Sequence, residues 1–141
     1  MPGSRRSPAR AVREQPFQYA LVQVVPFVER GERFNAGVIV HCPSRRYLAA
    51  RVALDRGVLA AIAPGRDAAV VQDYLEQIPR LCAGDPEAGP LARLRQAERF
   101  HWLVSPGSTV LQPSEVHTGL TADPAATLDH LFATLVERAG D

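Results

Sequence analysis

The amino-acid sequence predicts an α+β fold in which an antiparallel sheet of about five strands is packed by two to four helices. Three observations predict it. Apolar side chains alternate along residues 17–54, with turn residues between the runs, as in an N-terminal three-strand meander. Residues 55–83 and 123–136 carry apolar side chains at helical spacing. Residues 100–112 return to alternation, which adds a later hairpin to the sheet.

The meander occupies the first third of the chain. Residues 17–25 are apolar on both faces, which predicts an inner strand, and Pro26 marks a bulge or the strand's edge. Gly31 supplies a tight turn in the polar run that follows. Residues 33–42 and 47–54 then form the second and third strands of the predicted meander.

Capping residues mark the starts of the predicted helices. Asp55 begins a short helix, and Asp67 begins a second one. Pro79 would remove a backbone hydrogen bond within the second helix, so we expect a break or kink there. Asp123 followed by Pro124 predicts the start of a terminal helix whose apolar stripe packs on the sheet.

The later hairpin is predicted from a shorter pattern. Residues 100–104 alternate and form the fourth strand, with Trp102 in the core. A turn at residues 105–107 leads to the fifth strand at residues 108–112. This pairing would place His101 beside the fifth strand.

The composition is that of an ordinary globular protein, with 46% apolar and 22% charged residues among 141. This length predicts a single α+β domain at residues 15–141. No apolar run approaches the ~20 residues that span a bilayer, so we expect a cytoplasmic protein. Cys42 and Cys82 form no C-x-x-C pair, which predicts two reduced, buried thiols; a disulfide or a reactive thiol is the alternative.

Charge is unevenly distributed along the chain. Residues 1–14 are rich in Arg and Pro without periodicity, which predicts a disordered arm. From Gln15 onward there are 12 Arg against 14 Asp and Glu, a formal charge of −2. This slightly acidic balance disfavours general nucleic-acid binding by the domain and leaves contact through the basic arm as the alternative.

The sequence contains none of the easily recognised catalytic or cofactor motifs. It has no Gly-rich phosphate loop, dinucleotide fingerprint, H-E-x-x-H or G-x-S-x-G. His41, His101 and His117 lie on separate predicted elements, so we expect neither a metal site nor a cofactor.

Polar and titratable side chains are concentrated between residues 99 and 121. In one hypothesis Ser108 is a nucleophile activated by His117 and oriented by an acid such as Asp123, with Arg99 nearby. In a second, Arg99 and the hydroxyls bind an anion or carboxylate. In a third, the hydroxyls only satisfy backbone groups of strands and turns. The candidate catalytic residues are Ser108, His117 and Arg99, and the candidate binding residues are Arg33, Asn35, His101, Thr109, Gln112 and Thr118.

A family resemblance lies in four segments, FQYALVQVVPFVERGERFNAGVIV, YLAARVALD, RLCAGDPEAGP and RFHWLVSPGSTVLQPSEVHTGL. They resemble the bacterial domain-of-unknown-function family 3037 over roughly residues 16–137. The most specific parts are the first hairpin, with Asn35 and Gly37, and residues 99–119. The resemblance implies a bacterial cytosolic protein without an established activity. It also implies a possible partner, because members are often encoded beside a kinase-like protein of the HipA type.

Three functional hypotheses follow, in this order. The first is a non-catalytic binding or accessory module whose partner is the HipA-like kinase-type protein, since no catalytic signature is present. The second is a small hydrolase or transferase that uses the polar cluster of residues 99–121. The third is nucleic-acid contact through residues 1–14.

Overall fold

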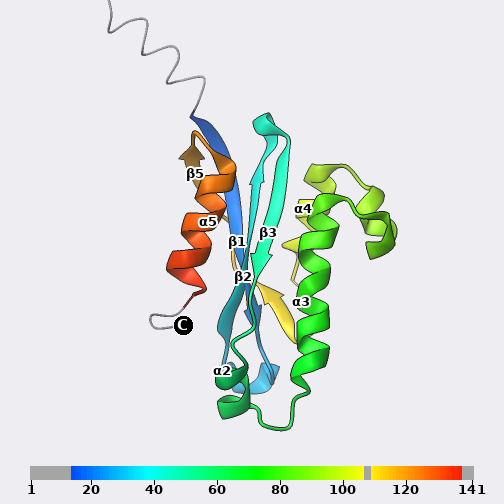
Figure 1. Ribbon diagram of the computed structural model, residues 1–141, viewed down its shortest axis with the longest axis vertical. Helices are drawn as coiled ribbons and strands as arrows, with labels where there is room; N and C mark the ends of the chain where they lie inside the picture. Colours follow the sequence, from blue (N-terminus) through cyan, green and yellow to red (C-terminus); the bar gives the residue numbers. More distant parts are fainter. Residues whose placement is uncertain (1–13, 107–108, 138–141) are drawn as a thin grey trace, which may run out of the picture.

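A computed structural model describes residues 14–106 and 109–137, and it has the predicted α+β architecture. Five antiparallel strands form one sheet in the order β3-β2-β1-β4, and β5 also pairs with β1. Helices α3 and α4 lie on one side of the sheet and α5 on the other (Figure 1). The elements, in chain order, are β1 (Gln15–Val24), β2 (Phe34–Cys42), β3 (Tyr47–Val52), α2 (Arg56–Ile62), α3 (Ala68–Ala83), α4 (Gln96–Leu103), β4 (Leu111–Pro113), β5 (His117–Thr121) and α5 (Pro124–Leu135), with short 3-10 turns η1 (Val28–Arg30), η2 (Pro43–Arg45), η3 (Pro86–Ala88) and η4 (Pro90–Arg93).

The predicted three-strand meander is confirmed. Strands β1 and β2 pair from Gln18 opposite His41 onward, and the register shifts by one residue near Ala36, which forms a β-bulge. Gly31 ends η1 with φ +75°, a left-handed conformation that favours glycine. Gly37 lies beside the bulge, where a Cβ atom would come within 2.9 Å of a Val52 methyl group. Close packing of β3 on β2 therefore requires a glycine at this position.

The sheet separates two apolar cores. The first core packs α3 and α4 against side chains such as Val24, Ile39 and Leu48. The second core packs α5 against the opposite face. Strand β2 is buried on both faces, which explains its nearly continuous apolar sequence. The second core consists of Phe17, Val38, Val40, Cys42, Leu128, Phe132 and Val136.

The three predicted aspartate caps are present. Asp55 accepts from Val58 N at 3.0 Å, Asp67 from Ala69 N at 2.9 Å, and Asp123 from Ala126 N at 3.2 Å. A break or kink was predicted at Pro79, and the break is wrong, because α3 continues through this residue to Ala83. Proline removes one backbone donor, but buried side chains on both sides of it anchor the helix to the first core.

The predicted strand at residues 100–104 is also wrong, since these residues belong to or follow α4. Glu98 accepts from the backbone N–H of Arg95 at 3.3 Å, which satisfies a donor at the helix start. Phe100 is buried, whereas Trp102 is 58% exposed and does not belong to the core. A run of five alternating residues was too short to distinguish strand from helix.

Strands β4 and β5 replace the predicted hairpin. They do not pair with each other. Both pair with β1, one after the other along its length. Ser114 joins them, because its backbone N–H donates to Leu21 O and its hydroxyl oxygen accepts from Leu21 N, both at 2.8 Å. The fifth predicted strand, residues 108–112, therefore overlaps β4 only in part, and β5 was not predicted.

Candidate functional site

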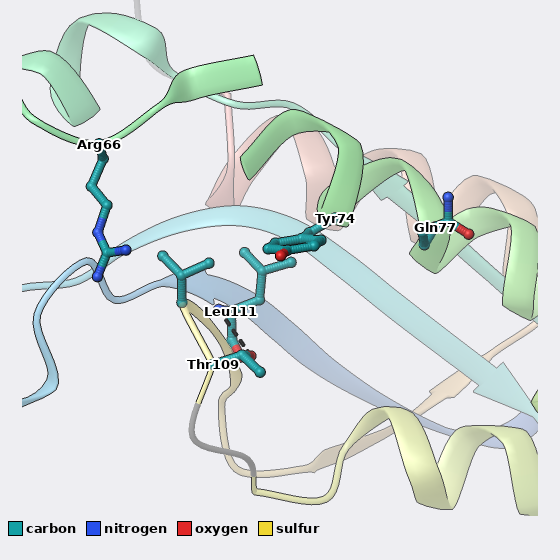
Figure 2. A pocket seen from close by; sticks show the side chains of 6 residues that line it. Arg66, Tyr74, Gln77, Thr109 and Leu111 are labelled. Carbon is teal, nitrogen blue, oxygen red and sulfur yellow. Dashed lines mark hydrogen bonds between the residues drawn. The ribbon is translucent and has the colours of Figure 1, made fainter. Parts of the chain in front are cut away.

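An open groove of about 480 Å³ lies between α3 and β4. Figure 2 shows its lining, with Arg66 at one end, the Tyr74 ring above Leu111, and Gln77 at the other end. The described residues that line it are Arg66, Tyr74, Gln77, Thr109, Val110 and Leu111. Its volume lies within the range of about 300–1,000 Å³ that is usual for ligand pockets.

Helix α3 forms one wall of the groove because some of its apolar side chains lie outside the face that packs on the first core. Val71 and Leu75 are buried in the first core. At about 100° per residue, Val70, Tyr74 and Gln77 lie together on a neighbouring face of the helix, within about 60°. Tyr74 is 52% exposed, so its ring borders the groove instead of filling the core.

Arg66 is held in place at the end of the groove by local contacts. Its Nη2 donates to Pro26 O, and its guanidinium carbon lies 5.2 Å from the centre of the Phe27 ring. Arg66 is the one charged residue among the described residues that line the groove. The groove therefore presents a positive charge with no carboxylate in its lining.

Thr109 blocks the outer edge of β4. Its hydroxyl donates to Leu111 O at 2.8 Å and accepts from Leu111 N at 3.3 Å. Gln112 adds a bond from Nε2 to Thr109 O at 2.7 Å. Thr109 and Gln112 were predicted as binding residues, and their side chains form hydrogen bonds with neighbouring backbone groups.

Arg99 does not point into a polar pocket. Its Nη1 donates to Leu94 O and its Nη2 to Cys82 O at 3.3 Å, so it connects α4 to the end of α3 and the η4 region. Its Nε is buried without a partner. Cys42 and Cys82 are both buried, as predicted, and they are not joined to each other. Burial raises the pKa of Cys82 to about 12, against the opposing effect of Arg99.

The other candidates of the polar cluster lie on different elements. His101 is exposed on α4, His117 on β5 stacks on Tyr19 with ring centres 5.1 Å apart, and Thr118 lies opposite Gln18. Ser108 lies outside the described residues. Because residues 99–103 are helical, the hairpin that was to bring this cluster together is not formed.

Arg33 and Asn35 belong to a network on the α5 side of the sheet. Gln23 Nε2 donates to Asn35 Oδ1 at 3.1 Å, and Arg33 Nη1 reaches Gln23 Oε1 at 3.4 Å. Asn35 Nδ2 donates to Leu135 O at 3.0 Å. The amide of Asn35 therefore satisfies a carbonyl at the C-terminal end of α5.

His41 is a buried histidine that the sequence did not distinguish. It is 4% exposed, its ring centre lies 4.8 Å from that of Phe100, and its Nδ1 has no partner. Burial lowers its pKa below the usual 6.5. In the described part of the chain, His, Cys, Asp and Glu side chains form no group of three or more that could hold a metal ion.

Sequence analysis missed the groove residues Arg66, Tyr74, Gln77, Val110 and Leu111. One signal for Tyr74 was available, because the apolar side chains of α3 span about 140° of the helix, more than one buried stripe requires. The rest of the lining depends on where β4 lies beside α3, which no local pattern reveals.

Comparisons with known proteins identify a family. The family model described as "Protein of unknown function (DUF3037)" matches residues 19–136, most of the chain. No curated protein and no solved structure matches it. In the described residues, no helix has the length and apolar character needed to cross a membrane. The chain belongs to the DUF3037 family of proteins of unknown function.

Proposed function

We propose that this protein is a non-catalytic module that binds another protein, and that a kinase-like protein of the HipA type is the partner. One observation carries the proposal: the groove between α3 and β4 combines an exposed Tyr74, an apolar floor and Arg66. Tyrosine and arginine are among the residues that contribute most to protein–protein binding. The partner, and a bacterial cytosolic setting, come from the family resemblance.

The positions of the polar side chains give further support. Acid–base or nucleophilic catalysis needs its groups within hydrogen-bond reach of each other. The guanidinium of Arg99 donates its hydrogen bonds to backbone carbonyls. Among the described residues, the His101 and His117 side chains have no hydrogen-bond partner. Binding, unlike catalysis, requires only an accessible surface of suitable shape, and the groove is such a surface.

Co-expression with a kinase-like protein of the HipA type from the same organism tests the proposal. The two proteins should co-purify as a stoichiometric complex, and calorimetry should give its dissociation constant. Tyr74→Ala should weaken binding by about 2 kcal/mol, as expected for an aromatic hot spot. Trp102→Ala is the matched control, because Trp102 is exposed to a similar degree but lies on α4. Failure to form a complex, or equal effects of the two substitutions, would contradict the proposal.

A further inference from the structure

We infer that the groove beside Tyr74 receives an extended acidic and apolar segment of the partner protein, held by side chains and not added to the sheet as another strand. This inference rests on the proposed function and specifies what the groove binds. It follows from the charge of the lining, its exposure and the blocked edge of β4.

The charge of the groove selects an acidic occupant. Arg66 supplies its positive charge, and no acidic residue is among the described residues that line it. The bond from Nη2 to Pro26 O and the contact with Phe27 hold the guanidinium in place. Among the described residues, Nε and Nη1 have no acceptor, so a carboxylate of the occupant can pair with this pre-positioned group.

The remainder of the groove selects an apolar side chain next to that carboxylate. Tyr74 is 52% exposed, and Val70, one turn earlier on α3, is 43% exposed. Val110 and Leu111 lie across the groove from Tyr74 and are half-buried. An aromatic or branched side chain would cover apolar surface that is otherwise in contact with water.

The exposure of the walls favours a peptide over an enclosed small molecule. Small-molecule sites typically bury about 70–90% of their ligand. Here four of the six lining residues are exposed, namely Arg66, Tyr74, Gln77 and Thr109. Such a surface fits a segment that lies across it and remains wet on its outer side.

The edge of β4 is closed to strand addition. Val25 N donates to Val110 O and Ser114 N to Leu21 O, so the backbone groups of Leu111 and Pro113 between them point away from β1. The Thr109 hydroxyl bonds both outward groups of Leu111, and Pro113 has no N–H. Both features are ways in which proteins protect edge strands. Side chains must therefore supply the recognition.

Four blocked octapeptides with serine and glycine flanks test the inference on the full chain. The first has two glutamates followed by phenylalanine and leucine at its centre. The second replaces the glutamates by glutamines, the third by lysines, and the fourth replaces the two apolar residues by alanines. Fluorescence anisotropy measures affinity, and amide NMR shifts should locate binding at Tyr74, Val110 and Leu111. The glutamate peptide should bind about two- to fivefold more tightly than the glutamine peptide, and the alanine peptide should not bind detectably.

Charge reversal separates recognition from damage to the fold. Arg66→Glu should invert the preference, so that the lysine peptide now binds more tightly than the glutamate peptide; this gain also shows that the variant is folded. Arg93→Glu, an exposed arginine outside the groove, should keep the original preference.

Three outcomes would overturn the inference. Equal affinity for the glutamate and glutamine peptides would remove the charge argument. Tighter binding by Thr109→Val, which frees the outward groups of Leu111, would show that the occupant adds as a strand. Absence of peptide binding, with partner binding still sensitive to Tyr74→Ala, would refute the inference and leave the proposed function standing, whereas loss of that sensitivity would refute both.

Discussion

Replacement of His41 by leucine should reduce the loss of stability that the protein undergoes between about pH 7.5 and about pH 5. In the folded protein His41 is buried against Phe100, and its Nδ1 has no partner. Burial lowers its pKa in the folded state below the usual 6.5. The unfolded chain therefore takes up a proton at a higher pH than the folded protein.

The direction and size of the effect follow from this difference. The stability contributed by neutral His41 is fully present above about pH 6.5 and declines as the pH falls toward the lowered pKa of the folded state. One proton can change the free energy of unfolding by at most about 1.4 kcal/mol per pH unit. The loss attributable to His41 between pH 6.5 and pH 5 is therefore at most about 2 kcal/mol.

Urea unfolding followed by circular dichroism at several pH values measures this loss. The quantity to compare is the change in free energy between the two pH values, since substitution of a buried residue also shifts stability at neutral pH. The hydrogen-bonded carboxyl groups of Asp85 and Glu98, whose pKa values are lowered by their bonds to Glu87 N and to Arg95 respectively, are present in both proteins. His130→Gln, at an exposed site on α5, is the control and should retain the wild-type loss. An identical loss in His41→Leu and the wild type would refute the reasoning.

Three further predictions concern local packing and reactivity. Ser114→Ala should lower the free energy of unfolding by about 1 kcal/mol, because the hydroxyl is the acceptor for a backbone donor of β1; unchanged urea unfolding would show that this bond is dispensable. Gly119→Ala should cost about 1–3 kcal/mol, because its Cβ would lie 2.7 Å from the buried ring of Phe17. Gly65→Ala, whose Cβ meets no atom within 4 Å, is the comparison, and equal effects at the two glycines would contradict the packing argument. Cys82, with a pKa of about 12, should resist a thiol reagent at about pH 8 in the native protein and react in urea, whereas rapid native labelling would contradict its burial.

The parts of the fold that were predictable are those with local signals. The meander was predictable because residues 17–25 are apolar on both faces and the turns between the strands contain Gly31 and Pro43. Three helix starts could be predicted because aspartate is a preferred capping residue. Asp55, Asp67 and Asp123 each accept a hydrogen bond from a backbone N–H two or three residues further along the chain. In these places the information that determines the structure lies within a few residues of the chain.

The errors occurred where distant contacts decide the structure. Alternation at Phe100 and Trp102 suggested a strand. In the structure only the Phe100 ring is buried, where it packs against His41, a residue far away in the sequence. The edge strands β4 and β5 form by pairing with β1, about a hundred residues earlier in the chain. The groove likewise exists only because β4 lies beside α3, so its lining could not be assembled from sequence spacing alone.

The position of β1 in the sheet has a consequence for how the chain folds during synthesis. One side of β1 can be paired with β2 as soon as the first meander has been made, but its other side waits for residues 111–121. Until then, a long apolar strand has open hydrogen-bonding groups along one flank, the kind of edge that recruits other chains. Fragments that end before β4 should therefore tend to aggregate, and completion of the sheet depends on the last third of the sequence.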